Sequence, residues 1–442
     1  MFSDIVLSLF MSDLELGKEL PLYSIVPFAL LLLAIAVLPL AVPHWWERNR
    51  NKAIISSICA LPILLFLIAN DYHLLVHTAT EYFSFIILLA SLFIISGGIH
   101  LKGAFAGTPL VNTAFLFVGA ILASFIGTTG ASMLLIRPLI KANEKRCHKA
   151  HIVVFFIFIV SNIGGCLTPL GDPPLFLGFL RGVRFEWTLI LLPQWMFVTS
   201  VLLVIFNLLD QYWFNKEELA THEPLVEEVQ PKRMMRIYGK MNFLFLFGVL
   251  VAIFLSGHFK APYGVQEGAM IFMTILSLWL TPREYRKAHD FDFAPIVEVA
   301  VLFAGIFVTM VPALLILNAR GGELGVEKPW QFFWATGALS GFLDNAPTYL
   351  TFTALASGLV KTDASHLNLL ADDPFGGSLL IAISCGAVFM GANTYIGNGP
   401  NFMVKSIAEK SGIKMPSFFG YMLWSVVILI PIFIITTLLF FL

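Results

Sequence analysis

Long apolar segments separated by short polar ones run along the whole chain. Several of them reach the roughly 20 residues that a helix needs to cross a bilayer. We therefore predict an all-α polytopic membrane protein. Uninterrupted spans are expected at residues 22–42, 53–70, 82–99, 187–209, 241–257, 266–281, 293–318 and 417–442.

Four further apolar elements are broken by Gly, Pro and polar residues. Pro lacks a backbone N–H and Gly favours non-helical angles, so a helix cannot run straight through such a break. Irregular backbone at membrane depth is tolerated only where it is buried in protein or lines a polar cavity. The breaks are GTTG (127–130) in 110–140, NIGGCLTPLGDPP (162–174) in 150–182, DNAP (344–347) in 330–360 and NTYIGNGPN (393–401) in 377–410.

The Lys and Arg residues of the short loops predict the sides of the membrane. The element 110–140 lies between Lys102 and the basic stretch RPLIKANEKRCHK (137–149), so both of its ends are expected in the cytoplasm. A re-entrant hairpin that opens to the cytoplasm satisfies this condition, and the alternative is one full span with a polar kink. A second hairpin, 330–360, is expected to open outward.

The two halves of the chain repeat this plan in opposite orientations. TPLGDPP (168–174) aligns with TYIGNGP (394–400), and FIGTTGA (125–131) aligns with FLDNAPT (342–348). Inverted repeats with broken helices are typical of secondary transporters. We predict about ten full spans plus two hairpins, with both termini outside. The expected divisions are a surface segment 1–21, a first repeat 22–209, a cytoplasmic linker 210–239 and a second repeat 240–442.

Composition supports membrane residence and excludes other classes. The chain is 58% hydrophobic and 12% charged, with a mean hydropathy of +0.85, whereas a soluble chain carries about 25% charged residues. A net charge of -1 gives no reason to expect a nucleic-acid partner. No HExxH, GxSxG or P-loop pattern occurs, so we expect neither an enzyme nor a cofactor. The expected location is the bacterial inner membrane.

Two carboxylates inside the apolar elements are the main candidates for chemistry, Asp172 and Asp344. A carboxylate at membrane depth is costly and is by default a functional candidate, although each Asp here could also cap a half-helix. Neutral oxygens from the same breaks would complete a sodium site. These oxygens belong to Asn162, Thr168, Asn345, Asn393, Thr394 and Asn398.

Further polar residues at or near the breaks are candidates for contact with a transported substrate: Thr128, Thr129, Thr348, Asn401 and Glu298. For each Asn or Thr the alternative is a bond within a local turn, and for Glu298, about five residues into its span, it is a side chain that extends to the inner membrane interface. Glu81 is expected at the membrane interface. Half-helix N-termini at the breaks would equally suit an anion.

At these motifs the sequence resembles the ion-transporter superfamily of citrate and dicarboxylate carriers, arsenite permeases and NhaD-type sodium/proton antiporters. SNIGGCLTPLGDPPLFLGFL (161–180) and LDNAPTYLTF (343–352) are similar to the antiporter motifs. The resemblance implies two hairpins, two broken helices, sodium coupling and a homodimer. It also implies that Asn162, Asp172, Asp344 and Asn345 handle the cation.

Two functions remain open from the sequence. The first is a sodium/proton antiporter, in which one buried carboxylate binds either a proton or sodium. The second is a sodium- or proton-coupled carrier of citrate or a related carboxylate. GANTYIGNGPN (391–401) departs from the Gly/Ser-rich antiporter pattern, and the Ser-Asn-Thr motifs of dicarboxylate carriers are incomplete. The partners predicted are therefore sodium, protons, a small carboxylate and the lipid bilayer.

Overall fold

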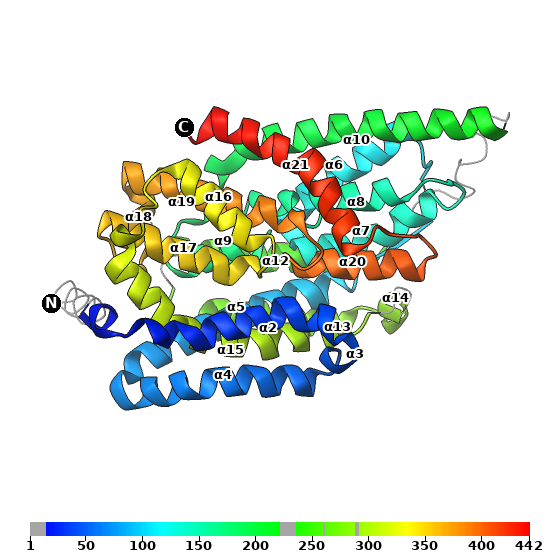
Figure 1. Cartoon of the computed structure of the whole chain (residues 1–442). Helices are drawn as coiled ribbons and strands as arrows, with labels where there is room; N and C mark the ends of the chain where they lie inside the picture. The colour runs from blue at the N-terminus through cyan, green and yellow to red at the C-terminus, as the bar shows by residue number, and fades with distance from the viewer. Residues whose placement is uncertain (1–14, 104, 222–235, 260, 288–290) are drawn as a thin grey trace.

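The computed structural model of the protein describes residues 15–103, 105–221, 236–259, 261–287 and 291–442. Within these ranges the chain is almost entirely helical (Figure 1), and nine helices are long and apolar enough to cross a membrane. Shorter apolar helices lie among them. The prediction of an all-α polytopic membrane protein is confirmed.

The first half contains three long helices, a hairpin, a broken helix and one further long helix. They are α2 (Val26–Ala41), α4 (Asn49–Asn70), α5 (Tyr72–Ser96), α6 (Pro109–Ile126), α7 (Thr128–Ala142), α8 (Ala150–Ile159), α9 (Pro173–Leu180) and α10 (Leu192–Thr221). The short elements among them are η1 (Leu22–Ile25), α3 (Pro43–Trp46), β1 (His100–Lys102), η2 (Ile163–Cys166) and η3 (Phe185–Leu191).

The second half has the same succession of elements. Its main helices are α12 (Met241–Phe259), α13 (Val265–Leu280), α15 (Ala294–Arg320), α16 (Pro329–Ser340), α17 (Asn345–Val360), α19 (Pro374–Met390), α20 (Gly399–Lys410) and α21 (Phe418–Phe440). The short elements are β2 (Arg236–Tyr238), α14 (Arg283–Lys287), η4 (Gly321–Leu324), α18 (Leu367–Asp372) and η5 (Gly391–Asn393).

Two helices extend beyond their predicted limits. The loop expected before residue 82 is helical from Tyr72, because the side chain of Asp71 accepts from the backbone N–H of Leu74 at 2.9 Å and caps α5. At the other boundary α10 continues to Thr221, so the helix runs into the predicted linker 210–239. Residues 222–235 of that linker and 1–14 of the predicted surface segment lie outside the described residues.

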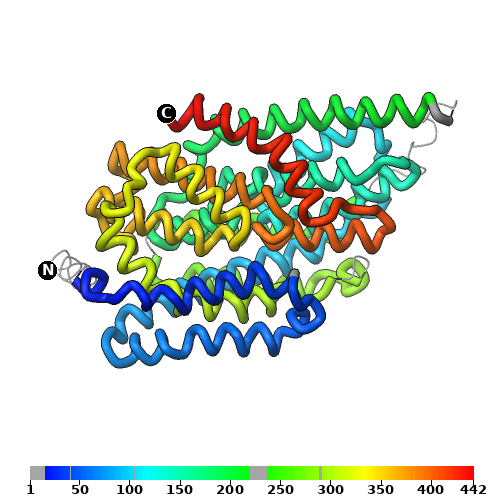
Figure 2. The backbone as a smooth tube through the Cα atoms, in the orientation of Figure 1, coloured from blue at the N-terminus to red at the C-terminus, as the bar shows by residue number. Residues whose placement is uncertain are grey.

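The elements form two groups that pack along a common direction. α2, α4, α5 and α15 lie together on one side, with the hairpins and broken helices on the other (Figure 1). The hairpin α6–α7 and the hairpin α16–α17 open toward opposite ends of the bundle. Figure 2 shows that the first described residues and the C-terminus lie at the same end.

Matching hydrogen bonds in the two halves show how closely the breaks repeat each other. The hydroxyl of Thr168 donates to the carbonyl of Ser124 in the first hairpin. The hydroxyl of Thr394 donates to the carbonyl of Gly341 in the second hairpin, at 2.6 Å. Thr168 aligns with Thr394, and Ser124 and Gly341 directly precede the two aligned hairpin segments. In each half, therefore, a Thr fastens the break of a helix to the adjacent hairpin.

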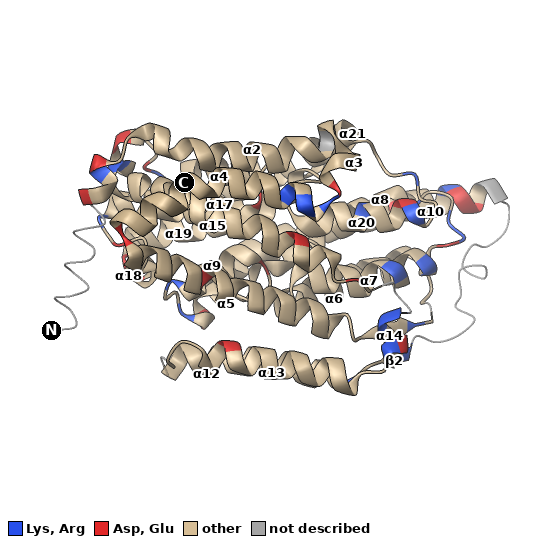
Figure 3. Cartoon of the chain, turned by 90° about the horizontal axis from the view of Figure 1, so that it is seen from below, with Lys and Arg blue, Asp and Glu red and all other residues tan. Residues whose placement is uncertain are grey.

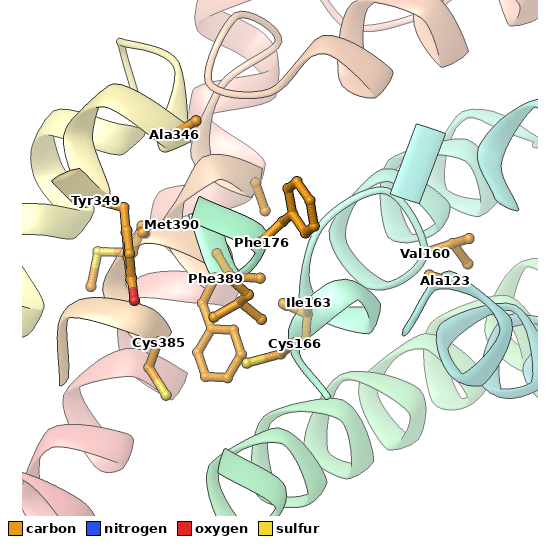
Figure 4. Packing of buried hydrophobic residues seen from close by; sticks show 14 of the residues in the cluster. Ala123, Val160, Ile163, Cys166, Phe176, Ala346, Tyr349, Cys385, Phe389 and Met390 are labelled. Atoms are coloured by element: carbon orange, nitrogen blue, oxygen red, sulfur yellow. The ribbon is translucent and has the colours of Figure 1, made fainter. Parts of the chain in front are cut away.

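The core behind the breaks is apolar. Ile163 and Cys166 of the first break are fully buried, and so are Cys385 and Phe389 of α19. Figure 4 shows the side chain of Cys166 beside that of Phe389, with Cys385 on the adjoining turn. Burial of such surfaces from both halves holds the first break against the second repeat, since apolar contact is the main stabilising term in such a core.

A buried charge network joins the α7–α8 loop and α8 to α10. The guanidinium of Arg146 donates to Asp210 at 2.9 Å and to Glu217 at 3.0 Å. The ring Nε2 of His151 lies 2.9 Å from the same Asp210 oxygen. Arg146 is 1% exposed and Asp210 is 0% exposed. Removing one partner of such a network leaves an uncompensated buried charge.

Candidate functional site

Asp172 lies at the centre of the breaks, where both halves of the chain meet. It is 1% exposed and directly precedes α9. One carboxylate oxygen accepts from the hydroxyl of Thr128 at 2.9 Å and from the amide of Asn398 at 3.3 Å. The other oxygen accepts from the amide of Asn345. A carboxylate of the first repeat is thus held by two residues of the second.

The tip of the first hairpin brings Thr128 to this carboxylate. α6 ends at Gly127, whose φ of 79° lies in a region that favours glycine, and α7 begins at the next residue. The backbone N–H of Thr128 donates to the carbonyl of Gly171 at 2.8 Å. The reversal at Gly127 therefore places both the backbone and the hydroxyl of Thr128 against the first broken helix. The hairpin predicted from the GTTG sequence is present.

Three asparagines join the two broken helices. The amide of Asn398 donates to the side-chain oxygen of Asn162 at 3.2 Å. The amide of Asn162 donates to the side-chain oxygen of Asn401 at 2.7 Å. The amide of Asn401 then donates to the carbonyls of Gly391 and Thr394, both at 2.9 Å. Asn401, a candidate for substrate contact, thus lies within the same hydrogen-bonded network as the candidate cation ligands.

The second hairpin and the second broken helix each contribute a side-chain oxygen that accepts no hydrogen bond from the described residues. Asp344 caps α17 by accepting from the backbone N–H of Ala346 at 3.0 Å, as the capping alternative expects. The side-chain oxygens of Asn345 and Asn393 are buried and have no hydrogen-bond partner among the described residues. Buried polar oxygens are rarely left unsatisfied in proteins. A cation would satisfy them, because it needs oxygen ligands and no donors, and so would an ordered water.

Four helices begin at this cluster: α7, α9, α17 and α20. The N-terminus of each carries a partial positive charge. These charges attract any anion that reaches the breaks. The helix termini therefore do not identify the ligand as a cation or an anion. The side chains at the breaks are the evidence that distinguishes the two.

A cavity of about 80 Å³ adjoins Asp172. Thr128, Thr129 and the Pro169–Pro173 segment line one side, and apolar residues of α5 and α15 line the other. Among the described residues that line it, Asp172 is the one charged side chain. The volume is sufficient for several water molecules, whereas pockets for organic ligands typically measure several hundred Å³. The cavity therefore suits a partly hydrated ion.

Two predicted substrate residues have other contacts. Glu298 forms an ion pair with Lys52 of α4 at 2.8 Å, and its side chain is 41% exposed. The hydroxyl of Thr348 donates to the carbonyl of Asp344 at 2.9 Å, a bond within its own helical turn. Glu298 is thus paired with Lys52 and is not among the residues that line the cavity beside Asp172. Thr348 makes a bond within its own turn, which was the expected alternative to substrate contact.

Sequence reasoning missed several residues that hold the site. The carbonyl of Ser161 accepts from Asn398 at 3.2 Å, and its hydroxyl is 2.8 Å from that of Ser132. Outside the site, Glu81, which was expected at the membrane interface, is 7% exposed and pairs with Arg181 at 2.9 Å. Ser161 carried a signal, because it directly precedes Asn162 in the first break. No feature of the sequence indicated the hydrogen-bond and ion-pair partners that come from distant segments.

The side chains at the breaks offer carboxylate oxygens and neutral amide and hydroxyl oxygens as ligands. Among the described residues no group of three or more His, Cys, Asp or Glu side chains is placed to hold a metal ion. Carboxylate, amide and hydroxyl oxygens suit hard cations rather than transition metals. Broken helices that meet at a polar cluster, in an integral membrane protein, define the class of secondary transporters.

Comparison with known proteins agrees with this class. A family model described as "Putative citrate transport" matches residues 17–441, and the chain belongs to this family. A protein of Mycobacterium tuberculosis named "Uncharacterized transporter" is 25% identical over 395 residues, which cover 82% of this chain and 87% of the relative. A "46 kDa membrane protein" of Mycobacterium leprae is 26% identical over 394 residues, with the same coverage. The protein is therefore a transporter of the citrate-transport family.

Proposed function

We propose that the protein exchanges sodium for protons across the membrane by alternating access, with Asp172 as the group that binds either ion. The observation that carries this proposal is the setting of Asp172. It is buried between the two repeats, next to an ion-sized cavity in which no other charged side chain was found among the described lining residues. Sodium and protons are then the transported species.

The ligands support sodium as the cation. The oxygen ligands available at the breaks are the unpartnered side-chain oxygens of Asn345 and Asn393 and the carboxylates of Asp172 and Asp344. Sodium and a proton compete for Asp172, because protonation removes the charge and occupies an oxygen that the cation needs. Exchange follows when either loaded form, but not the empty form, moves the site from one face to the other.

A carrier of citrate or a related carboxylate is the second candidate. It is favoured by the family to which the chain belongs and by the four helix N-termini at the breaks. Sodium would then serve as the coupling ion and the carboxylate would occupy the cavity. The buried carboxylate of Asp172 counts against it, because a multiply charged anion there has no cationic side chain among the described lining residues. Inner-membrane location, outside termini and a homodimer stay predictions.

Asn393→Ala is expected to weaken sodium binding about tenfold or more, as losses around a metal site commonly do. The reason is that the buried Asn393 oxygen, unpartnered among the described residues, would lose its role as a ligand. The measurement is the thermal unfolding midpoint of the purified protein as sodium chloride replaces choline chloride at constant ionic strength. Stabilisation follows ligand concentration relative to Kd.

Asn70→Ala is the matched control, because the Asn70 amide bonds within its own helix, to the carbonyl of Phe66 at 2.8 Å. This variant is expected to retain the sodium dependence of the wild type. The assignment of Asn393 as a ligand is wrong if Asn393→Ala shows the same sodium dependence as well. A wild-type midpoint that responds to citrate and not to sodium would favour the second candidate function.

A further inference from the structure

A buried ion pair joins α5 to the end of α9. The guanidinium of Arg181 donates to both carboxylate oxygens of Glu81, from Nε at 2.9 Å and from Nη2 at 3.0 Å. The remaining nitrogen, Nη1, donates to the carbonyl of Ala364 at 3.2 Å. Both side chains of the pair are 7% exposed. Two parallel charged hydrogen bonds are the strong form of this contact, so the pair holds α9 against α5 at a defined place.

The pair connects the two groups of elements in the fold. α5 belongs to the group with α2, α4 and α15, whereas Arg181 directly follows α9, which is half of the first broken helix. The ion pair between Lys52 and Glu298 joins α4 to α15 within the first group, and the Arg146 network joins elements outside it. Among the ion pairs found between described residues, the Glu81–Arg181 pair is thus the one that connects the two groups.

A short helix connects this pair to the candidate ion site. α9 has eight residues, begins directly after Asp172 and ends directly before Arg181. Eight helical residues rise about 12 Å. Because a helix of this length is stiff, the ion pair at one end of α9 fixes the position of Asp172 at the other end relative to α5.

The cavity beside Asp172 extends away from the pair. In α5 its lining begins at Leu88, and Glu81 lies roughly two helical turns earlier. In the other direction the lining reaches Pro295, which is exposed in the first turn of α15. Between Glu81 and Leu88, the fully buried ring of Phe85 stacks on a ring of α15 with centroids 4.9 Å apart. Packed apolar side chains and the ion pair therefore close the route from Asp172 in the direction of Glu81.

The closed route leads to one particular end of the bundle. The carbonyl of Arg181 accepts from the backbone N–H of Leu367, the first residue of α18, at 2.7 Å. Figure 3 shows α18 at the opposite end of the bundle from β2 and α14. The loop charges predict that the end with α14 faces the cytoplasm. The pair therefore lies toward the predicted outer face.

The second repeat has no counterpart of this arginine. If the alignment of 168–174 with 394–400 is continued along the two helices, Ile407 of α20 takes the place of Arg181. The broken helix of the second repeat forms without a basic residue at that position. The fold itself therefore does not require the arginine, which favours a function for it in one half of the molecule.

We propose that the Glu81–Arg181 pair is a gate that closes the Asp172 site toward the end with α18 and separates when the site opens there. Alternating access requires such a barrier whichever solute is carried, so the inference depends on the transporter class and not on sodium/proton exchange. A buried ion pair suits a contact that breaks and re-forms, because the cost of taking two charges out of water offsets much of their attraction. Water that enters the open route solvates both charges again.

The test measures from which face of the membrane the cavity can be reached. The reporter is Thr129→Cys, at a cavity-lining position, in full-length protein whose four native cysteines are replaced by alanine. A membrane-impermeant maleimide is applied to intact cells and to inside-out vesicles. A separate reporter, Leu369→Cys at an exposed position of α18, identifies the face at which α18 lies. Adding Glu81→Gln is expected to raise the labelling rate of the cavity reporter from the α18 face at least about tenfold, because one partner of a buried charge pair is lost.

Glu217→Gln is the matched control, since Glu217 is also a buried glutamate that accepts from an arginine, but its pair does not involve α5 or α9. It is expected to leave this labelling rate unchanged. The proposal is overturned if Glu81→Gln does not raise the rate, or if Glu217→Gln raises it equally. Should Glu81→Gln not fold, Arg181→Lys keeps the charge but loses the two-point contact, and the same increase is expected. Labelling requires no ion gradient, so its outcome does not depend on which solute is exchanged.

Discussion

Asp172→Asn is expected to reduce sodium-dependent proton movement by at least about 100-fold, the size of effect that a lost proton-transfer group has. The amide has nearly the shape of the carboxylate, but it neither takes up a proton nor carries a charge for sodium. Thr128 can still donate to its one remaining side-chain oxygen. The measurement is pH-sensitive dye fluorescence in proteoliposomes to which a sodium gradient is applied.

Asp292→Asn is the control for this experiment, because Asp292 is exposed and lies before the start of α15. It is expected to transport like the wild type. A thermal unfolding curve separates loss of transport from loss of folding in the Asp172 variant. If Asp172→Asn folds and exchanges ions at the wild-type rate, Asp172 is not the group that binds the proton.

Arg146→Met is expected to lower the free energy of unfolding by about 3–5 kcal/mol. It removes a partner that bonds both Asp210 and Glu217, two carboxylates that are 0% and 5% exposed. The remaining carboxylates would then be buried with less compensation. The change is measured as the shift of the unfolding transition in detergent.

Lys145→Gln is the matched control, since Lys145 neighbours Arg146 in the sequence but is exposed. It is expected to change stability little, as most surface substitutions do. Combining Arg146→Met with Asp210→Asn should cost less than the sum of the two single changes, because the second removes a buried charge that the first left with less compensation. Additive losses, or an Arg146 variant as stable as the wild type, would show that the network contributes little.

The sequence was sufficient to locate the breaks and the hairpins. GTTG and DNAP interrupt apolar runs, and Gly127 and Asp344 indeed stand where one helix ends and the next begins. Such local signals depend on backbone conformation, which neighbouring residues determine. The basic stretch after the first break further predicts that this hairpin opens to the cytoplasm, and this direction stays a prediction.

Contacts between side chains of distant segments could not be predicted from the sequence. Glu81 was expected at the membrane interface, and nothing near it in the sequence indicates the buried pair that it makes with Arg181. Glu298 was predicted to be a candidate for transport. Its ion-pair partner, Lys52, lies in another helix, so the sequence does not show that the two side chains pair. The extension of α10 was missed because Asp210 and Glu217 suggested a solvated loop, whereas Arg146 compensates them inside the fold. A single sequence does not show which charges meet.

The direct test of sodium/proton exchange is transport by purified protein in proteoliposomes that contain no organic anion. A sodium gradient alone is expected to drive protons in the opposite direction, at a rate that added citrate does not change. Empty liposomes give the leak rate. Proton movement that begins only when citrate is added, together with uptake of labelled citrate, would contradict the proposal and identify a carboxylate carrier.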